Sequence, residues 1–435
     1  MTTLVVRGPS AVEGRTTVPG DKSISHRALM IAAMAQGRSH IHGLGPGDDV
    51  DATRRCLESY GIGFDDAGDG VVVHGTDIAS WREPLRALDC ANSGTTMRLL
   101  SGLAARCPFS SSLDGDASLR RRPMDRIVHP LRNLGARVDA VDGVFPPLTV
   151  GGGSLTGTRI AIDVPSAQVK SCVILAALGA SGRTTISMPV ATRDHTEQML
   201  CSLGAEVESR RRADGSVEIA VNPPFTPSPF SYEIPGDVSS AAFLVAAGLL
   251  CGHVEIVDVG LNATRVGFLD VCRRMGASLV WVVNDTSMGE SNGRIDAERS
   301  TLRGVGVEGR VVPLMIDEVP LLAVLGTAAE GTTTVTGADE LRVKESDRIS
   351  AIVAALRRMG AEIDERPDGF EVRGPSELNG AVVSACGDHR IAMALAIAAL
   401  RANGETRIEG FEAAAVSWPG FEEALSDLGA DVELQ

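Results

Sequence analysis

The feature that most constrains the fold is a phrase that recurs six times, at a spacing of roughly 70 residues. Each copy is a helical run that ends on a glycine and is followed by alternating polar and apolar residues. A glycine directly after a helical run is typical of a helix C-terminus, where the backbone turns left-handed. The six glycines are Gly61, Gly135, Gly204, Gly276, Gly360 and Gly429. We therefore predict six amphipathic helices, each followed by a strand.

A second phrase repeats with the same period. It is a polar start followed by a helix of small apolar residues, and the copies begin at Gly20, Ala91, Val164, Ile234, Ile316 and Cys386. Helices that are apolar nearly all round are buried inside a domain. The sequence thus predicts an α/β fold of six repeats, each containing a strand, a buried helix, a strand, an amphipathic helix and a further strand.

The division of the chain into domains follows from its length and from one interruption. A chain of 435 residues is too long for one ordinary hydrophobic core, so two domains are expected. The Pro-rich stretch NPPFTPSPF at 222–230 separates the third repeat from the fourth and is typical of a crossover. We predict one domain at 19–230, a second made of 1–18 and 231–435, and two crossing strands.

Composition excludes several classes of partner. The 41 basic and 56 acidic residues give a net charge of −15, which disfavours a nucleic acid or an anionic membrane as partner. Apolar stretches near 172–180 and 241–251 are too short to span a bilayer, and the N-terminus lacks the pattern of a signal peptide. The eight scattered cysteines form no CxxC pair, which indicates free thiols in a reducing compartment. A cytoplasmic monomer is expected.

Basic residues gather at the predicted helix N-termini. A helix N-terminus favours anions, so Lys and Arg there are unfavourable for the helix and need another cause. Ser23 and Arg27 are one turn apart, as are Lys344 and Arg348, with Glu345 three residues before Arg348. Each motif alone could be a surface salt-bridge lattice, and the Ser and Asp residues could be simple caps. Together they predict one anion site shared by the two domains.

Familiar cofactor and metal motifs are absent from the sequence. There is no Walker loop, no strand-bound GxGxxG, no HExxH and no Gly-x-Ser-x-Gly elbow. The eight histidines show no metal-ligand spacing. We therefore expect neither a metal nor a cofactor.

An ordered series of motifs carries a family resemblance. The segments are PGDKSISHR, ANSGTTMR, RRRPM, PSAQVKS, TRDHTE, IPGDVSSAA, IDE, ELRVKESDR and GDHRIAMA. Over essentially the whole chain, the sequence resembles the 5-enolpyruvylshikimate-3-phosphate synthase family, and especially its second bacterial class. The resemblance implies a two-domain inside-out α/β barrel of six βαβαββ repeats, three per domain, with buried helices surrounded by sheets. It also implies transfer of the enolpyruvyl group of phosphoenolpyruvate to the 5-hydroxyl of shikimate 3-phosphate, in the route to aromatic amino acids, without a cofactor.

The resemblance also implies the residues of the site. Shikimate 3-phosphate would contact Lys22, Ser23, Arg27, Ser166, Ala167, Gln168, Arg193, Asp317 and Lys344. Phosphoenolpyruvate would contact Lys22, Gly94, Arg122, Gln168, Glu345, Arg348 and Arg390. Asp317 is the expected base for the 5-hydroxyl, and Glu345 and Lys22 are the candidates for protonation of C3. A carboxylate among cations is ionised, whereas Glu345 as an acid requires desolvation. Two phosphoryl groups and two carboxylates bring about five to six negative charges, which the seven cations of these motifs would balance.

Three places in the chain bear on how it differs within the family. Ala415 and Val416 stand where some members carry a lysine, so phosphate release would depend more on Lys22 and Arg122. Gly94 leaves open the space that a larger residue fills in glyphosate-insensitive members, which predicts inhibition competitive with phosphoenolpyruvate. Leu99 stands where some members have Pro.

Two alternatives remain open from the sequence. The sister transferase acting on UDP-N-acetylglucosamine shares the fold, but its family has a reactive cysteine in the loop before the Arg-Pro pair. Here residues 113–124 contain none, and Cys107 is the nearest upstream. The other alternative, a non-catalytic repeat protein that binds phosphorylated metabolites, would not need Asp317 and Glu345 among its cations.

Overall fold

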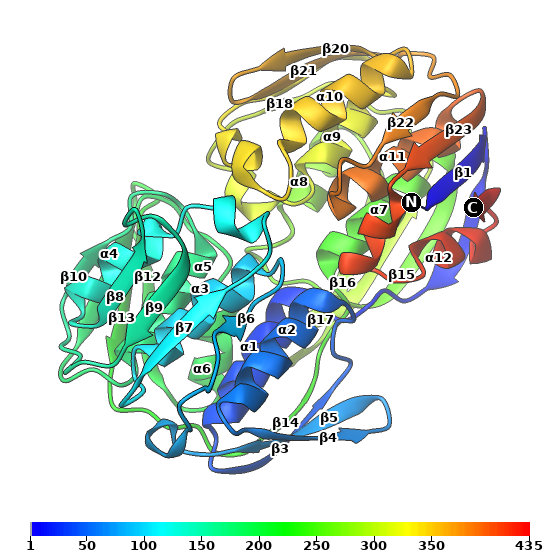
Figure 1. Ribbon diagram of the computed structural model, residues 1–435. Coiled ribbons are helices and arrows are strands. Elements are labelled where there is room, and N and C mark those ends of the chain that lie inside the picture. Colours follow the sequence, from blue (N-terminus) through cyan, green and yellow to red (C-terminus); the bar gives the residue numbers. More distant parts are fainter. Residues whose placement is uncertain (1) are drawn as a thin grey trace. The chain divides into compact units, whose positions relative to one another are not determined.

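The computed structural model describes residues 2–435 (Figure 1). The chain forms two compact units. Unit 1 contains the N-terminal segment to Pro19, then Pro235–Asp285 and Ser291–Gln435. Unit 2 contains Gly20–Ile234 and the short segment Thr286–Glu290. That these units are the domains predicted at 19–230 and at 1–18 plus 231–435 stays a prediction.

Each unit contains three four-stranded mixed sheets. In unit 2 the strand orders are β14-β3-β5-β4, β6-β7-β9-β8 and β10-β11-β13-β12. The bounds are β3 (Gly37–His42), β4 (Gly63–Ala67), β5 (Gly70–Gly75), β6 (Leu88–Asp89), β7 (Ser110–Asp114), β8 (Arg137–Val141), β9 (Phe145–Gly151), β10 (Arg159–Ala161), β11 (Thr184–Met188), β12 (Glu206–Arg211), β13 (Val217–Asn222) and β14 (Ser231–Glu233). The first two strands of each order are parallel, and the other neighbours are antiparallel.

The sheets of unit 1 repeat this arrangement. Their strand orders are β16-β17-β15-β2, β18-β19-β21-β20 and β22-β23-β1-β24. The bounds are β1 (Thr3–Gly8), β2 (Val12–Thr16), β15 (Gly252–Gly260), β16 (Ser278–Ser287), β17 (Glu290–Glu298), β18 (Gly306–Val307), β19 (Gly331–Val335), β20 (Glu362–Arg366), β21 (Gly369–Gly374), β22 (Val382–Ser384), β23 (Gly404–Glu409) and β24 (Val432–Leu434). The six sheets confirm the six predicted repeats, which we number one to six along the chain.

One helix of each repeat is buried. These helices are α1 (Lys22–Met34), α3 (Gly94–Ala104), α5 (Ala167–Ala177), α7 (Val238–Cys251), α9 (Val319–Gly326) and α11 (His389–Arg401). They lie in the two hydrophobic cores, one for each unit, together with residues of the strands and the other helices. In α7, every residue from Val238 to Leu250 is buried. In Figure 1, α9 and α11 lie inside the strands of their own unit. The prediction of buried helices surrounded by sheets is therefore confirmed.

The second helix of each repeat is amphipathic and ends as predicted. These helices are α2 (Asp48–Ser59), α4 (Asp125–Asn133), α6 (His195–Ser202), α8 (Gly267–Arg274), α10 (Arg348–Arg358) and α12 (Phe421–Asp427). The six repeated glycines that follow them have φ between +87° and +99°. After each glycine, the next N–H donates to a carbonyl five residues earlier, for example Ala361 to Leu356 at 2.9 Å. This is the hydrogen bond of the Schellman motif, which requires the left-handed glycine.

Two strands cross over in sequence, as expected. β2 precedes α1 in the chain but pairs in parallel with β15 of repeat four. β14 precedes α7 but pairs in parallel with β3 of repeat one. The chain's second strand thus supplies repeat four, and a strand from the end of the first half supplies repeat one. The segment Thr286–Glu290 at the β16–β17 turn was not predicted to belong with the first half of the chain. None of the helices within residues 2–435 is long and apolar enough to cross a membrane.

Candidate active site

The first cluster, in unit 2, is centred on Arg27 of α1. Its guanidinium donates from Nε to Thr196 Oγ1 (2.8 Å), from Nη1 to the Ser23 carbonyl (2.7 Å) and from Nη2 to Ser171 Oγ (2.9 Å). No carboxylate lies within ion-pair distance of it in the described part of the chain. Burial lowers the pKa of Arg27 to about 10, so it stays charged at neutral pH. A buried cation held by neutral groups is suited to binding an anion.

Lys22 lies at the start of the same helix, where Asp21 caps α1 by accepting from the Ile24 N–H (2.9 Å). The Lys22 ammonium pairs with Asp49 at 3.1 Å, and both side chains are mostly buried. Asp49 belongs to the first turn of α2, where the sequence suggests only a favourable interaction with the helix dipole. The partner of Lys22 was therefore missed.

A second group in unit 2 surrounds Gly94, the first residue of α3. Arg98 Nη1 donates to Gln168 Oε1 (2.6 Å), and Gln168 Nε2 donates to Thr95 Oγ1 (2.8 Å). A Cβ on Gly94 would lie 2.7 Å from Arg98 Nη1 and 3.4 Å from Arg122 Nη1. The fold therefore brings together Gly94, Gln168 and Arg122, whose binding of phosphoenolpyruvate stays a prediction. It adds Arg98, which the sequence analysis left out.

The other predicted residues of unit 2 lie at segment ends. Ser166 caps α5, accepting from the Val169 N–H at 3.4 Å, and Ala167 is the first residue of that helix. Arg193 lies just before α6, and its positive charge contributes to lowering the pKa of Arg27. Arg122 is mostly buried and donates to Asn92 Oδ1 at 2.5 Å. Like Arg98, Asn92 was not predicted, although it belongs to the quoted ANSGTTMR segment.

In unit 1, Arg348 is enclosed by three carboxylates. It is the first residue of α10 and is buried. Its Nε donates to Asp388 (2.8 Å), its Nη1 to Asp317 (3.1 Å) and its Nη2 to Glu345 (2.7 Å). Burial lowers the pKa of the guanidinium, but the three carboxylates outweigh that effect and raise it above its usual value. The three acids thus share one permanent positive charge.

Asp388 was not predicted as a site residue. The sequence placed it in the GDHR motif, where it serves as the N-cap of α11 and accepts from the Arg390 N–H (2.8 Å). Its other oxygen accepts from both Arg348 Nε (2.8 Å) and Ser346 Oγ (3.0 Å). The side chain is fully buried. Asp388 therefore connects the starts of two helices whose arginines were both predicted to bind phosphoenolpyruvate.

Arg390 and Lys344 are the other two cations of unit 1 that were predicted for the site. Arg390 is 3% exposed, and its Nε and Nη1 have no hydrogen-bond partner within residues 2–435. Its guanidinium lies 5.8 Å from the centre of the Phe243 ring. Burial lowers the pKa of the Lys344 ammonium, although the charges of Glu340 and Asp317 act to raise it. Buried donors without partners are costly, which indicates that an anion completes them.

The two predicted acid–base residues have the same partner. Asp317 and Glu345 both pair with Arg348, at 3.1 and 2.7 Å, and their side chains are each 21% exposed. An ion pair favours the carboxylate form. This suits a base at Asp317. For Glu345 to donate a proton, its pair with Arg348 must loosen, which the sequence reasoning did not include.

One group of possible metal ligands lies outside these clusters. His42, Asp69 and Glu233 place their ligand atoms within 4.8 Å of one another. They come from positions far apart in the chain, so the spacing of histidines in the sequence could not reveal them. Asp69 and Glu233 are exposed, and exposed acidic groups of this kind are common without a metal.

The family of the chain follows from comparison with known proteins. The family model described as EPSP synthase (3-phosphoshikimate 1-carboxyvinyltransferase) matches residues 6–425. The chain is 43% identical over 422 residues to a 3-phosphoshikimate 1-carboxyvinyltransferase of Bacillus cereus, covering 96% of this chain and 97% of that protein. This chain belongs to the EPSP synthase family. The relative in Bacillus thuringiensis (strain Al Hakam) has the same identity and coverage. The predicted membership of the EPSP synthase family is confirmed.

Solved structures agree with this assignment to the EPSP synthase family. EPSP synthase from Acinetobacter baumannii superposes with a TM-score of 0.88 at 37% identity, covering 100% of both chains. The enolpyruvyl transferase NikO from Streptomyces tendae has a TM-score of 0.79 at 20% identity, which shows a shared fold. The chain is therefore a transferase with the two-domain inside-out fold of EPSP synthases, and the comparisons support neither alternative left open by the sequence.

Proposed function

We propose that this chain transfers the carboxyvinyl group of phosphoenolpyruvate to the 5-hydroxyl of shikimate 3-phosphate and releases phosphate. Its 43% identity over 96% of its length to a 3-phosphoshikimate 1-carboxyvinyltransferase supports this reaction. Among the residues, Arg390 gives the strongest support for this proposal. Its guanidinium is buried and two of its nitrogens have no hydrogen-bond partner within residues 2–435, in a chain of net charge −15. An anionic substrate would supply the missing acceptors.

Shikimate 3-phosphate is assigned to the Arg27 cluster. Three cations and a hydroxyl lie near the start of α1, from Lys22, Arg27, Arg193 and Ser23. The start of α5 adds further polar groups. The helix dipole strengthens anion binding there. The full set is Lys22, Ser23, Arg27, Ser166, Ala167, Gln168 and Arg193 from unit 2, with Asp317 and Lys344 from unit 1.

Phosphoenolpyruvate is assigned to the cations that surround Gly94 and those held near Asp388. Arg122 and Arg348 are both buried, so the directions of their guanidinium groups are fixed. Arg122 can bind phosphate or carboxylate bidentately, and Arg348 can do so once the substrate replaces one of its carboxylates. The full set is Lys22, Gly94, Arg122, Gln168, Glu345, Arg348 and Arg390. Because Val416 and Ala415 replace a lysine of some members, Lys22 and Arg122 carry the departing phosphate.

Proton transfer is assigned to the residues that share Arg348 and to Lys22. The oxygen of the 5-hydroxyl bonds to C2 of phosphoenolpyruvate while Asp317 takes the proton of that hydroxyl. An acid delivers a proton to C3. Loss of a C3 proton then expels phosphate and restores the double bond. Lys22 or Glu345 serves as the acid, and Glu345 does so once substrate draws Arg348 away.

The wider assignments follow from the same proposal. The enzyme works as a cytoplasmic monomer on two small anionic substrates, with no metal or cofactor, no nucleic acid and no membrane. The two units act as domains that close on the substrates and exclude water. The proposed role belongs to the route to chorismate and the aromatic amino acids.

A coupled phosphate assay tests the proposed reaction. Phosphate should be released from phosphoenolpyruvate only when shikimate 3-phosphate is present, and not when UDP-N-acetylglucosamine replaces it. Thiol-alkylating epoxides should leave the rate unchanged. Release without shikimate 3-phosphate, or inactivation by the epoxide that substrate prevents, would contradict the proposal.

Rapid-quench analysis of Asp317→Ala tests the base. Without Asp317, the tetrahedral intermediate should not accumulate at the normal rate. Asp317→Asn serves as the matched variant, since it keeps the shape but cannot accept the proton. If the tetrahedral intermediate accumulates at the normal rate in Asp317→Ala, Asp317 is not the base.

A further inference from the structure

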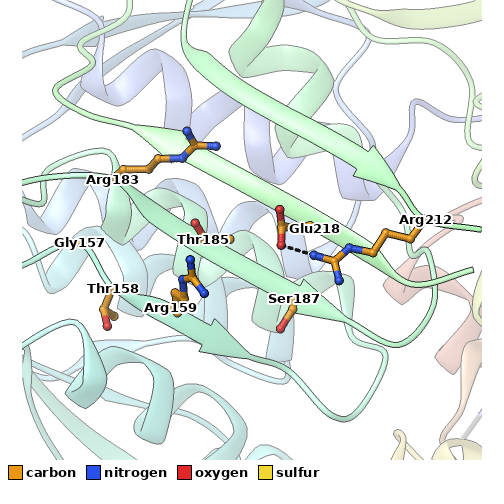
Figure 2. Close-up of a pocket in the computed structure, with 8 residues that line it drawn as sticks. All are labelled: Gly157, Thr158, Arg159, Arg183, Thr185, Ser187, Arg212 and Glu218. Carbon is orange, nitrogen blue, oxygen red and sulfur yellow. Dashed lines mark hydrogen bonds and ion pairs between the residues drawn. The ribbon is translucent and has the colours of Figure 1, made fainter. Parts of the chain in front are cut away.

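The sheet of repeat three has a hollow on its outer face (Figure 2). Successive strand residues point to opposite faces, so Thr184, Ile186 and Met188 face the core while Thr185 and Ser187 face outward. The hollow has a volume of about 800 Å³, within the range of small-molecule sites. It is lined by Gly157, Thr158, Arg159, Arg183, Thr185, Ser187, Arg212 and Glu218.

The charge of this hollow is positive. Arg159 on β10 and Arg183 just before β11 are exposed and have no hydrogen-bonding or ion-pair partner within residues 2–435. The one carboxylate of the lining, Glu218, is already paired with Arg212 at 2.6 Å. Two guanidinium charges therefore remain unbalanced in the hollow, although the chain as a whole carries −15.

The other repeats provide an internal comparison, because their sheets share the topology. On the repeat-five sheet, Arg373 pairs with Glu362 (2.7 Å) and Glu371 (3.1 Å). On the repeat-six sheet, Arg7 pairs with Asp431 (3.2 Å) and Glu433 (2.7 Å). Cross-strand pairs of opposite charge are the usual way to balance arginines on a sheet.

Repeats one and four follow the same rule. Arg38 faces Asp65 at 3.9 Å, and both Arg15 and Arg294 face Glu255 at 3.6 Å. Arg159 and Arg183 of repeat three depart from it. The register partner of Arg159 on the sheet is Thr185, which carries a hydroxyl group and no charge.

We infer that this hollow binds a small oxyanion that carries two or more negative charges, such as a phosphorylated or polycarboxylate metabolite. Each free guanidinium can donate two parallel hydrogen bonds to one phosphate or carboxylate group. The hydroxyls of Thr158, Thr185 and Ser187 supply further donors on the same face. Figure 2 shows Thr185 and Ser187 on the strand between Arg159 and Glu218. None of the lining residues belongs to the proposed substrate sites, so this site is separate from catalysis.

Titration calorimetry with inorganic pyrophosphate and, separately, citrate tests the site. The wild-type chain should show one binding event beyond that of the active site. Arg159→Gln/Arg183→Gln should weaken this extra event by about tenfold or more, because both bidentate donors are lost. Arg366→Gln/Arg373→Gln removes the same charge from paired arginines on the repeat-five sheet and should leave the extra binding event unchanged. The stronger of the two probes shows whether phosphate or carboxylate is preferred.

A variant of the active site separates this inference from the proposed function. Arg122→Gln should weaken the active-site event and keep the extra one, whereas Arg159→Gln/Arg183→Gln should keep normal turnover. If the calorimetry of wild type and Arg159→Gln/Arg183→Gln is the same, the site does not exist. Equal weakening in the Arg366→Gln/Arg373→Gln control would also overturn it, because the loss of affinity would then follow from the charge of the whole chain and not from this hollow. Should the double variant fold poorly, Arg183→Gln alone is tested, with a smaller loss of affinity expected.

Discussion

At the scale of single residues, the candidate site is defined by how its cations are held. Arg27 is held by two hydroxyls and a carbonyl, Arg348 by three carboxylates, and Arg390 has two nitrogens without a partner. The three arginines therefore differ in what they can give to a ligand. Arg390 can accept an anion without losing any bond, whereas Arg348 must exchange a carboxylate for the substrate.

Asp388→Asn should strongly impair the enzyme although the side chain keeps its shape. One oxygen of Asp388 caps α11 through the Arg390 N–H, and the other accepts from two donors. In Asp388→Asn, an amide nitrogen in place of the second oxygen would face two other donors, Arg348 Nε and Ser346 Oγ, and could not accept from them. We expect kcat/KM for phosphoenolpyruvate to fall by about 10- to 100-fold, mostly through KM.

Steady-state kinetics of this variant has a matched control in Ser346→Ala. That change removes only the hydrogen bond from Ser346 Oγ to Asp388, so kcat/KM for phosphoenolpyruvate should fall by less than about threefold. An Asp388→Asn enzyme with normal kcat/KM would show that Asp388 does not position the arginines.

Gly94→Ala should act through Arg98. The new methyl group would lie 2.7 Å from Arg98 Nη1 and force that guanidinium off Gln168. We expect KM for phosphoenolpyruvate to rise by about tenfold and inhibition by glyphosate to weaken. In an Arg98→Gln background, Gly94→Ala should have a much smaller effect, because coupled residues are not additive. Equal effects in both backgrounds would mean that the methyl group acts elsewhere.

His26 should make the stability of the protein fall in mild acid. Its ring is fully buried, and burial, with the charges of Lys22 and Arg27, lowers its pKa well below 6.5. Below pH 6.5 the unfolded chain binds a proton that the folded chain does not. The free energy of unfolding should therefore drop by up to about 1.4 kcal/mol per pH unit from this group alone, with no contribution above pH 6.5.

Urea unfolding at pH 7.5 and pH 5.5 measures this effect. His26→Asn should lose less stability between the two pH values than the wild type does. His40→Asn, at an exposed histidine, should behave like the wild type. The same pH dependence in all three proteins would contradict the role of His26.

At the scale of elements, the fold is built from one helix ending used six times. The glycine after each amphipathic helix is left-handed, and the following N–H closes the Schellman bond. This turn directs the chain into the next strand, which explains why the phrase recurs so faithfully in the sequence. The buried helices need no such signal, because their apolar surface alone places them inside.

Gly204→Ala isolates the value of the left-handed turn. Gly204 has φ of +93°, and a Cβ there would meet nothing within 4 Å, so only backbone strain is added. We expect the free energy of unfolding to fall by about 1 kcal/mol and calorimetry to give a lower Tm. Gly306→Ala is the control, because its Cβ also meets nothing and its φ is not left-handed. A similar loss in both variants would show that the turn is not the cause.

At the scale of the whole molecule, the chain exchanges strands between its halves. β2 completes the sheet of repeat four and β14 completes that of repeat one. Each unit therefore depends on a segment that its own half of the sequence does not supply.

Small-angle scattering tests the proposed closure. Adding shikimate 3-phosphate should reduce the radius of gyration, because the anion would neutralise cations assigned to both units. Arg27→Ala should abolish the change at the same ligand concentration, and Arg159→Gln, which lies outside the proposed substrate sites, should not. An unchanged radius at saturating substrate would exclude closure of this kind.

Local patterns in the sequence were enough to establish the six repeats, the six left-handed glycines, the buried helices and the family. These depend on local chemistry: helix periodicity, C-terminal glycines and ordered motifs are all readable along the chain. Several partners of the site residues emerged only from the folded chain, namely Asp49 for Lys22, Asp388 for Arg348 and Arg98 for Gln168. The same holds for Arg159 and Arg183, which line one hollow whose single carboxylate, Glu218, is paired with Arg212. Such pairings join residues from different elements, so they depend on packing and register, which no local pattern encodes.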